Sequence, residues 1–244
     1  RINSSLIKAN KEINFVFNGK KYKGFEGDTL ASALIANGIK LIARSFKYHR
    51  PRGIISSGSQ EPNGLVELVH NSFREPNTKA TTVELYEGLI AKSQNCWPSL
   101  KFDLMSINDK FSNFIGAGFY YKTFMWPASF WEKIYEPLIR KAAGLGTLSY
   151  NKNERVSEKG FLHCDILVIG SGPSGLISAY IAGLSGAKVI LVEEDFIFGG
   201  NLNNESFDIS KMSAQEWVHT IVKDITKMPN VRCMKRTCVI GMFD

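Results

Sequence analysis

Two short apolar runs, at residues 165–169 and 188–192, carry the clearest hydrophobic pattern in the chain. Runs of this length that are rich in β-branched residues are typical of strands buried on both faces of a parallel sheet. A glycine-rich turn at residues 170–175 follows the first run, and a helical stretch at 176–184 leads to Gly186, which is placed to end the helix. The pattern therefore predicts a strand–helix–strand unit.

Alternation of apolar and polar residues predicts a different fold near the N-terminus. Residues 12–23 alternate on both sides of Asn18-Gly19, a favoured two-residue turn, and indicate a β-hairpin. Either Asp28 or Thr29 is suited to cap the helix that follows. The further elements expected here are a helix at residues 30–37 and, after a long loop, a strand at 64–69.

Helical periodicity returns in two later stretches. A helix is expected at residues 128–143, where aromatic residues are dense. Another is expected at 212–228, where Ser213 and Glu216 have the spacing of a capping box. The last expected strand covers residues 230–240.

These elements predict two different folds in one chain. Residues 1–75 are expected to form a small α+β, β-grasp-like module, and residues 76–160 an aromatic-rich connecting region and linker. Residues 161–244 are expected to start an α/β, Rossmann-type dinucleotide-binding domain of the FAD/NAD(P) kind. Because such a domain needs more strands than these residues supply, we expect the chain to be the front of a longer protein.

Charge is distributed unevenly along the chain, whose net charge is +7 at pH 7. Residues 1–160 hold 23 Lys and Arg against 14 Asp and Glu, whereas residues 161–244 hold 7 against 9. In the loop at residues 44–53, five basic side chains are interleaved with Phe46 and Tyr48. Such a mixture suits either a nucleic acid or a docked interface. Because no nucleic-acid fold signature accompanies it, we expect an inter-subunit or inter-domain element and no nucleic-acid partner.

The spacing of the cysteines and the length of the apolar runs indicate in which cellular compartment the protein is expected. The four cysteines, Cys96, Cys164, Cys233 and Cys238, form no Cys-x-x-Cys pair, which favours a reduced, intracellular protein with buried thiols. No apolar run reaches the roughly 18 residues of a membrane helix, and no signal peptide is visible. We therefore expect a cytoplasmic protein without a membrane partner.

The candidate chemistry is centred on the turn GSGPSG at residues 170–175, which matches Gly-x-Gly-x-x-Gly. Gly170 permits the tight turn, Gly172 lets backbone approach a pyrophosphate, and Gly175 lets the helix pack close to the sheet. The second strand ends in Glu193, 18 residues past Gly175. A carboxylate there can accept hydrogen bonds from an adenosine ribose, so the segment indicates a dinucleotide site.

The motif leaves the identity of the dinucleotide open. NAD and FAD present the same pyrophosphate and adenosine to it, whereas the acidic run Glu193-Glu194-Asp195 argues against NADP, whose 2′-phosphate favours an arginine. The later Gly199-Gly200-Asn201 either brings more backbone to the nucleotide or forms a plain turn.

Four stretches of the chain together resemble the alpha subunits of heterotetrameric sarcosine oxidases. They are GDTLASALIANG at residues 27–38, SFKYHRPRG at 45–53 with GSQEPN at 58–63, AGFYYKTFMWP at 117–127, and the glycine turn with Glu193 and Gly199-Gly200. The resemblance spans nearly all 244 residues and would make this chain the N-terminal part of such a subunit.

The resemblance implies a function for the whole complex. Such a complex, built from alpha, beta, gamma and delta subunits, oxidises sarcosine to glycine, with tetrahydrofolate taking up the one-carbon unit and oxygen becoming peroxide. It implies NAD bound to the alpha subunit, FAD in the beta subunit and FMN between the two. The folate-binding domain of the family lies outside this chain, and the groups that react with sarcosine would belong to the beta subunit.

The nucleotide site can then be assigned residue by residue. Ser174 and the three glycines would meet the pyrophosphate through backbone N–H groups and the helix N-terminus. Glu193 would hold the ribose, and Val239, at the end of the third strand, would pack on adenine. The cofactor-binding candidates are Gly170, Gly172, Pro173, Ser174, Gly175, Glu193, Glu194, Asp195, Gly200, Asn201 and Val239. We expect neither catalytic residues nor metal ligands in this chain.

The resemblance implies that the α+β module at residues 1–75 is a ferredoxin-like β-grasp module, but the cysteine positions lead us to expect it to lack iron–sulfur ligands and to hold no cluster. A ferredoxin-type cluster needs four thiolates, three of them close together in the loop after the helix, and residues 41–63 contain no cysteine. Two other functions stay open. One is a subunit of an FAD-dependent amino-acid or opine dehydrogenase, and the other is a non-catalytic assembly subunit that binds its nucleotide structurally.

Overall fold

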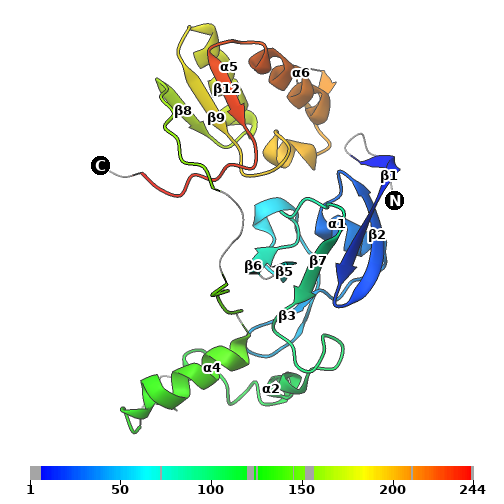
Figure 1. Ribbon diagram of the computed structural model, residues 1–244, viewed down its shortest axis with the longest axis vertical. Helices are drawn as coiled ribbons and strands as arrows, with labels where there is room; N and C mark the ends of the chain where they lie inside the picture. The colour runs from blue at the N-terminus through cyan, green and yellow to red at the C-terminus, as the bar shows by residue number, and fades with distance from the viewer. Residues whose placement is uncertain are drawn as a thin grey trace. The chain divides into compact units, whose positions relative to one another are not determined.

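The computed structural model of the chain has two compact units, Arg1–Arg155 and Val156–Asp244, here called unit 1 and unit 2 (Figure 1). It describes residues 7–242 apart from 72, 120–123, 125, 145, 152–156 and 210. Each unit has its own cluster of buried hydrophobic side chains. No helix in the described part of the chain is long and apolar enough to cross a membrane.

Unit 1 is built on a five-stranded sheet of order β2-β1-β7-β5-β6. The predicted hairpin is confirmed, because β1 and β2 pair antiparallel around Asn18 and Gly19, which both have the positive φ of a tight hairpin turn. Strand β7 lies parallel to β1 and antiparallel to β5. The strands are β1 (Lys8–Phe17), β2 (Lys20–Glu26), β5 (Leu65–His70), β6 (Phe73–Lys79) and β7 (Leu89–Ser93).

Helix α1 (Leu30–Ala36) supplies much of the core of unit 1. Its N-cap is Thr29, whose side chain accepts from the Ser32 N–H while the Ser32 hydroxyl accepts from the Thr29 N–H. Leu30 and Leu34 are fully buried with Phe15 of the sheet. The helix predicted at residues 30–37 is therefore confirmed.

The loop between β4 (Pro51–Arg52) and β5 is organised around the carboxylate of Glu61, which is fully buried. Its oxygens accept hydrogen bonds from the backbone N–H groups of Ile55, Ser56 and Asn63 at 2.7–2.8 Å. Burial alone would raise the pKa of Glu61, but the backbone donors outweigh it and hold that pKa below its ordinary value.

The remainder of unit 1 is irregular. The helix expected at residues 128–143 begins later: a π-helical turn at Trp131–Tyr135 precedes α4 (Glu136–Ala143), because Pro137 cannot donate a backbone hydrogen bond. Its expected end is confirmed, since Gly144 is a left-handed C-cap. The other short elements are β3 (Ala43–Arg44), η1 (Gly58–Gln60), η2 (Leu104–Ser106) and α2 (Ile107–Lys110).

Unit 2 contains a parallel three-stranded sheet of order β12-β9-β8. Helices α5 and α6 pack against each other and against these strands. Ser213 and Glu216 form the predicted capping box of α6. The elements are β8 (Ile166–Ile169), α5 (Pro173–Leu184), β9 (Val189–Val192), η4 (Gly200–Asn203), β10 (Asp208–Ile209), β11 (Met212–Ser213), α6 (Ala214–Thr226) and β12 (Val231–Met234).

Of the two runs expected to be buried on both faces, β9 is buried at all four residues, whereas β8, which pairs with β9 in the described residues, is buried at Val168. A second expectation about these strands is wrong. The strand expected at residues 230–240 ends at Met234. It ends there because Arg236 has φ +53° and its N–H bonds to the Asp195 carbonyl, which turns the chain away from the strand direction.

Helix α1 offers a matched test of the core of unit 1. Leu34 is fully buried, whereas the adjacent Ile35 is 51% exposed. We expect Leu34→Ala to lower the free energy of unfolding by about 2–5 kcal/mol, because it leaves a cavity, and Ile35→Ala to lower it by less than about 1 kcal/mol. Urea unfolding of the two variants checks this, and equal losses would contradict the assignment of the core.

Glu61 provides a pH-dependent test of the loop. Because its folded-state pKa is lowered from an ordinary value of 4.5, its carboxylate stabilises the fold above that pH, and the contribution is lost as the pH falls through the folded pKa. Glu61→Gln should therefore be less stable than the wild type at neutral pH, with a difference that shrinks in acid. Unfolding across a pH series measures it, with the exposed Glu132→Gln as control. A difference independent of pH would contradict the prediction.

Candidate dinucleotide-binding site

The glycine turn joins β8 to α5, as the sequence predicted. Gly170 has φ +87°, which favours glycine, and its N–H donates to the Val192 carbonyl of β9 at 2.9 Å. A Cβ on Gly175 would collide with the Gly170 carbonyl oxygen, whereas a Cβ on Gly172 would meet open space. Gly175 therefore closes the turn on the strand, and Gly172 leaves room for a ligand to approach.

The first turn of α5 has free capacity for an anion. Its N-cap, Gly172, provides no side-chain hydrogen bond, and Pro173 occupies the start of the helix. Ser174 is exposed at this end. Backbone N–H groups without helical acceptors and the positive end of the helix dipole make such a terminus suited to a phosphate.

The carboxylate of Glu193 is turned inward to the glycine turn and is only 7% exposed. Its Oε2 atom accepts from the Ser171 backbone N–H at 2.8 Å and from the Ser171 hydroxyl at 2.5 Å. Its Oε1 atom accepts from the Asp195 N–H at 3.0 Å. The structure thus brings the predicted acid and the predicted turn together through Ser171.

Ser171 is the residue that sequence reasoning missed. It is fully buried, and its hydroxyl oxygen also accepts from the Gly199 N–H at 3.0 Å. Ser171 and Glu193 are 22 residues apart in the chain, so their contact depends on how β8 and β9 pair. The signal in the sequence is a hydroxyl residue between the first two glycines of the turn, and no local pattern indicates its partner.

The second glycine pair lies against the turn. A Cβ on Gly200 would lie 3.3 Å from the Gly172 Cα, and Gly199 has φ +119°. Asn201 follows in η4 and is exposed. Of the two interpretations left open, this placement favours a segment that lines the nucleotide site over a distant plain turn.

The other predicted residues follow β9 and β12 in the chain. Glu194 is exposed, and the Asp195 carboxylate accepts from the Phe196 N–H at 2.7 Å within its own loop. Val239 lies five residues past the end of β12 and is 40% exposed, so its expected place at the end of the third strand is wrong. The structure therefore joins Glu193 to the glycine turn through Ser171, whereas the side chains of Glu194 and Val239 are exposed.

The basic loop at residues 44–53 in unit 1 packs largely on its own unit. The buried Arg44 donates to the carbonyl oxygens of His49, Leu100 and Lys101 at 2.7–3.2 Å. Lys47 and Tyr48 donate to the carbonyl oxygens of Gly116 and Ile115. Several of its charges are thus engaged within unit 1, and its role between subunits stays a prediction.

The imidazole of His49 joins three segments of unit 1. Nδ1 lies 2.6 Å from the Asp103 carboxylate, and Nε2 lies 2.9 Å from the Ala142 carbonyl oxygen near the end of α4. His49 is therefore an internal structural tie, buried to 2% exposure.

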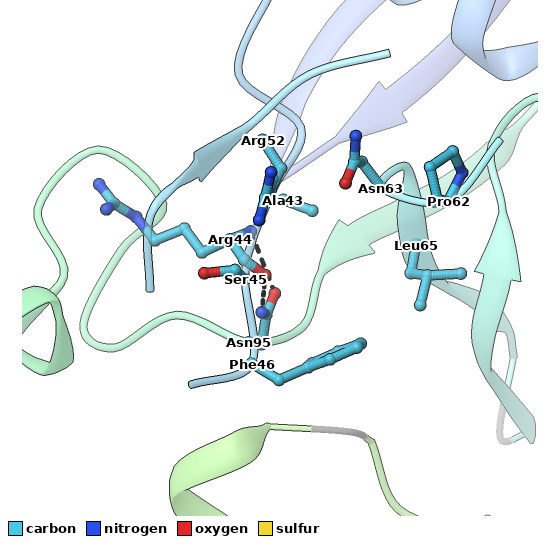
Figure 2. Close-up of a pocket in the computed structure, with 9 residues that line it drawn as sticks. All are labelled: Ala43, Arg44, Ser45, Phe46, Arg52, Pro62, Asn63, Leu65 and Asn95. Carbon is cyan, nitrogen blue, oxygen red and sulfur yellow. Dashed lines mark hydrogen bonds between the residues drawn. The ribbon is translucent and has the colours of Figure 1, made fainter. Parts of the chain in front are cut away.

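A small pocket of about 110 Å³ lies beside β3 and β4 in unit 1 (Figure 2). The Asn95 side chain forms part of its wall and pairs with the backbone N–H and carbonyl of Arg44, much as a neighbouring strand would. The lining residues are Ala43, Arg44, Ser45, Phe46, Arg52, Pro62, Asn63, Leu65 and Asn95. The predicted nucleotide residues all lie in unit 2, whereas the residues that line this pocket lie in unit 1.

The cysteines differ in exposure and are all free thiols. Burial raises the pKa of the Cys96 thiol and of the Cys233 thiol, whereas Cys238 is exposed. Across the described residues, no group of three or more His, Cys, Asp or Glu side chains is arranged to hold a metal ion.

Comparison with known protein families assigns each unit separately. Residues 10–96 match a family described as 2Fe-2S iron-sulfur cluster binding domain, and residues 165–236 match a family described as FAD dependent oxidoreductase. Unit 1 thus contains a ferredoxin-like domain, and unit 2 contains a fragment of an FAD-dependent oxidoreductase domain.

Individual relatives cover almost the whole chain. It is 52% identical, over 98% of its length, to sarcosine oxidase subunit alpha of Rhizobium meliloti strain 1021. This chain is a homologue of sarcosine oxidase alpha subunits. Identity to the corresponding subunit of Corynebacterium sp. strain U-96 is 28%, again over 98% of the chain. The chain spans 24% and 20% of the lengths of these two relatives.

A solved structure supports the fold of this alpha-subunit homologue. The crystal structure of L-proline dehydrogenase from P. horikoshii superposes with a TM-score of 0.57 at 19% sequence identity. The match covers 97% of this chain and 36% of that protein. At this level of identity the likeness concerns the fold.

The family matches overturn both of our expectations about cofactors. We expected a first module without an iron–sulfur cluster, but its family is described as binding a 2Fe-2S cluster. We expected NAD as the principal dinucleotide, but the family of unit 2 is described as FAD dependent. The second error arose because the glycine turn meets pyrophosphate and adenosine, which the two dinucleotides share.

The side chains of the alpha-subunit homologue can be compared with what each cofactor requires. Ferredoxin-type clusters are held by four thiolates, and residues 10–96 contain one cysteine, the half-buried Cys96. That range alone therefore does not supply the usual ligand set. In unit 2, by contrast, the glycine turn, the open helix terminus and Glu193 fit the adenosine diphosphate half of FAD.

Two glycines of the turn should respond differently to the same substitution. We expect Gly175→Ala to lower the free energy of unfolding of unit 2 by about 1–3 kcal/mol, because the added methyl meets the Gly170 carbonyl. Gly172→Ala should leave stability nearly unchanged but weaken dinucleotide binding, because the methyl enters the open space beside the turn. Thermal unfolding and ligand titration of both variants check this. Equal losses of stability would contradict it.

Proposed function

We propose that this chain is the N-terminal part of the alpha subunit of a multi-subunit sarcosine oxidase, an oxidoreductase acting on a CH–NH bond. The 52% identity to a sarcosine oxidase alpha subunit over 98% of the chain carries the proposal. The FAD-dependent family match of unit 2 supports a flavin oxidoreductase. In this proposal unit 2 binds FAD, and the other subunits of the complex are the partners.

The proposed reaction of the whole complex is the oxidative demethylation of sarcosine to glycine. Oxidation at the methyl C–N bond releases two electrons, which reduce oxygen to hydrogen peroxide, and tetrahydrofolate takes up the one-carbon unit. Bound flavin supplies the capacity to accept and pass on these electrons. We place this activity in the cytoplasm.

The residues of this chain would bind and orient the dinucleotide. The first-turn N–H groups of α5 would face the pyrophosphate, with Gly172 and Gly200 providing close backbone approach. Glu193 would accept a hydrogen bond from the ribose of the adenosine. None of these groups is assigned a proton or hydride transfer step, so the reacting groups would lie elsewhere in the complex.

The finer fold assignments belong to the same proposal. The sheet order β12-β9-β8 corresponds to the order 3-2-1 in the first half of a Rossmann-type sheet, which supports that fold for unit 2. The hairpin, α1 and the mixed sheet support a β-grasp fold for unit 1. We retain residues 161–244 as the proposed dinucleotide-binding domain, and we propose that the first module, expected at residues 1–75, extends through β7 because β7 pairs with β1 and β5 in its sheet.

Nucleotide analysis of the full-length subunit, purified with its partner subunits, tests the proposed function. We expect FAD to be released on denaturation and Glu193→Gln to weaken its binding by about 1–3 kcal/mol, the typical cost of removing a charged hydrogen-bond partner. The exposed neighbour Glu194→Gln is the matched control and should have little effect. Oxygen uptake with sarcosine, compared with proline, tests the substrate.

Two results would overturn this proposal. Release of NAD without FAD from a subunit whose binding depends on Glu193 would exclude the flavin assignment. Oxygen uptake with proline but not with sarcosine would exclude the substrate. Thermal unfolding of both glutamate variants separates a loss of binding from a loss of folding.

A further inference from the structure

Ser171 has a hydrogen-bonding arrangement that goes beyond closing the glycine turn. Its backbone N–H and its hydroxyl both donate to the same oxygen, Oε2 of Glu193, at 2.8 and 2.5 Å. We infer that Ser171 is a positioning residue, which fixes the Glu193 carboxylate so that Oε1 alone receives a ribose hydroxyl. The inference rests on the proposed binding of a dinucleotide in unit 2.

Counting acceptor sites on the carboxylate supports this assignment. A carboxylate offers about four lone-pair sites, two on each oxygen. Ser171 occupies two of them on Oε2, and the Asp195 N–H occupies one on Oε1 at 3.0 Å. One site is left, on Oε1, so Glu193 has capacity for one further strong hydrogen bond rather than for a bidentate grip on the ribose diol.

The orientation of the Ser171 hydroxyl is fixed by its other neighbour. The Gly199 N–H donates to the hydroxyl oxygen at 3.0 Å and to the Ser171 carbonyl oxygen at 3.1 Å. Because that neighbour is a donor, the hydroxyl proton must point to Glu193. The Ser171 hydroxyl therefore accepts from Gly199 and donates to Glu193, and the reverse arrangement is not possible.

Burial makes this arrangement sensitive to the side chain at position 171. Ser171 is fully buried and Glu193 is 7% exposed, so water has little access to replace a lost donor. With alanine at position 171, Glu193 would lose one of its three donors and the hydrogen bond that sets its rotation. The carboxylate would then hold the ribose hydroxyl less well, whereas the pyrophosphate contacts of the helix terminus would remain.

The test uses the full-length subunit in its complex, cleared of bound nucleotide, with ADP, 2′-deoxy-ADP and 3′-deoxy-ADP as calorimetric probes. In the wild type we expect ADP to bind roughly 10-fold more tightly than one of the two deoxy analogues, the effect of one hydrogen bond to a charged group. Ser171→Ala should weaken ADP binding by roughly 10-fold and leave binding of that analogue unchanged. Ser185→Ala, at the exposed far end of α5, is the matched control.

A double variant connects the effect to Glu193. If Ser171 acts through the carboxylate, Ser171→Ala combined with Glu193→Gln should bind ADP no more weakly than Glu193→Gln alone. Weaker binding of all three probes by the same factor in Ser171→Ala would indicate a merely structural role and overturn the inference. Equal affinity of the wild type for all three probes would overturn it while dinucleotide binding stands. Failure of the wild type to bind ADP would overturn the proposed function as well.

Discussion

The buried carboxylate of Glu193 is the constraint on which the candidate dinucleotide-binding site depends. An ionisable group with so little exposure is tolerated only where hydrogen-bond donors surround it. The donors come from the glycine turn and from the residues that follow β9, while Ser171 in turn binds Gly199. The hydrogen bonds of this one carboxylate and of Ser171 therefore hold together the glycine turn, the residues after β9 and the second glycine pair, which form the candidate site.

Buried polar side chains play a corresponding part in unit 1. In the long loops, the carboxylates of Glu61 and Asp103 accept hydrogen bonds from backbone N–H groups, and Asp103 also contacts the imidazole of His49. Arg44 and Lys47 are engaged in the same way with carbonyl oxygens. Part of the basic excess in this half of the sequence thus serves internal structure, which is why charge alone gave no reliable indication of a partner.

Local patterns predicted what depends on neighbouring residues. The hairpin at Asn18-Gly19, the Thr29 N-cap of α1, the capping box of α6 and the end of α4 at residue 143 follow from rules that span a few positions, and the structure confirms them. Predictions that needed a partner far along the chain did less well. Val239 was misplaced because Arg236 turns the chain after β12.

The candidate site shows the same division between local and distant information. The spacing of its three glycines located the turn, but Ser171 could be recognised only after β8 and β9 were paired. The identity of the cofactor could not be predicted from the turn, because such a turn contacts only the adenosine diphosphate half, which NAD and FAD share. What distinguishes them, the nicotinamide or the flavin, would be met by other parts of the protein, and this chain spans about a quarter of its relatives. The adenosine half can therefore be argued from these residues, whereas the redox half had to come from the family match.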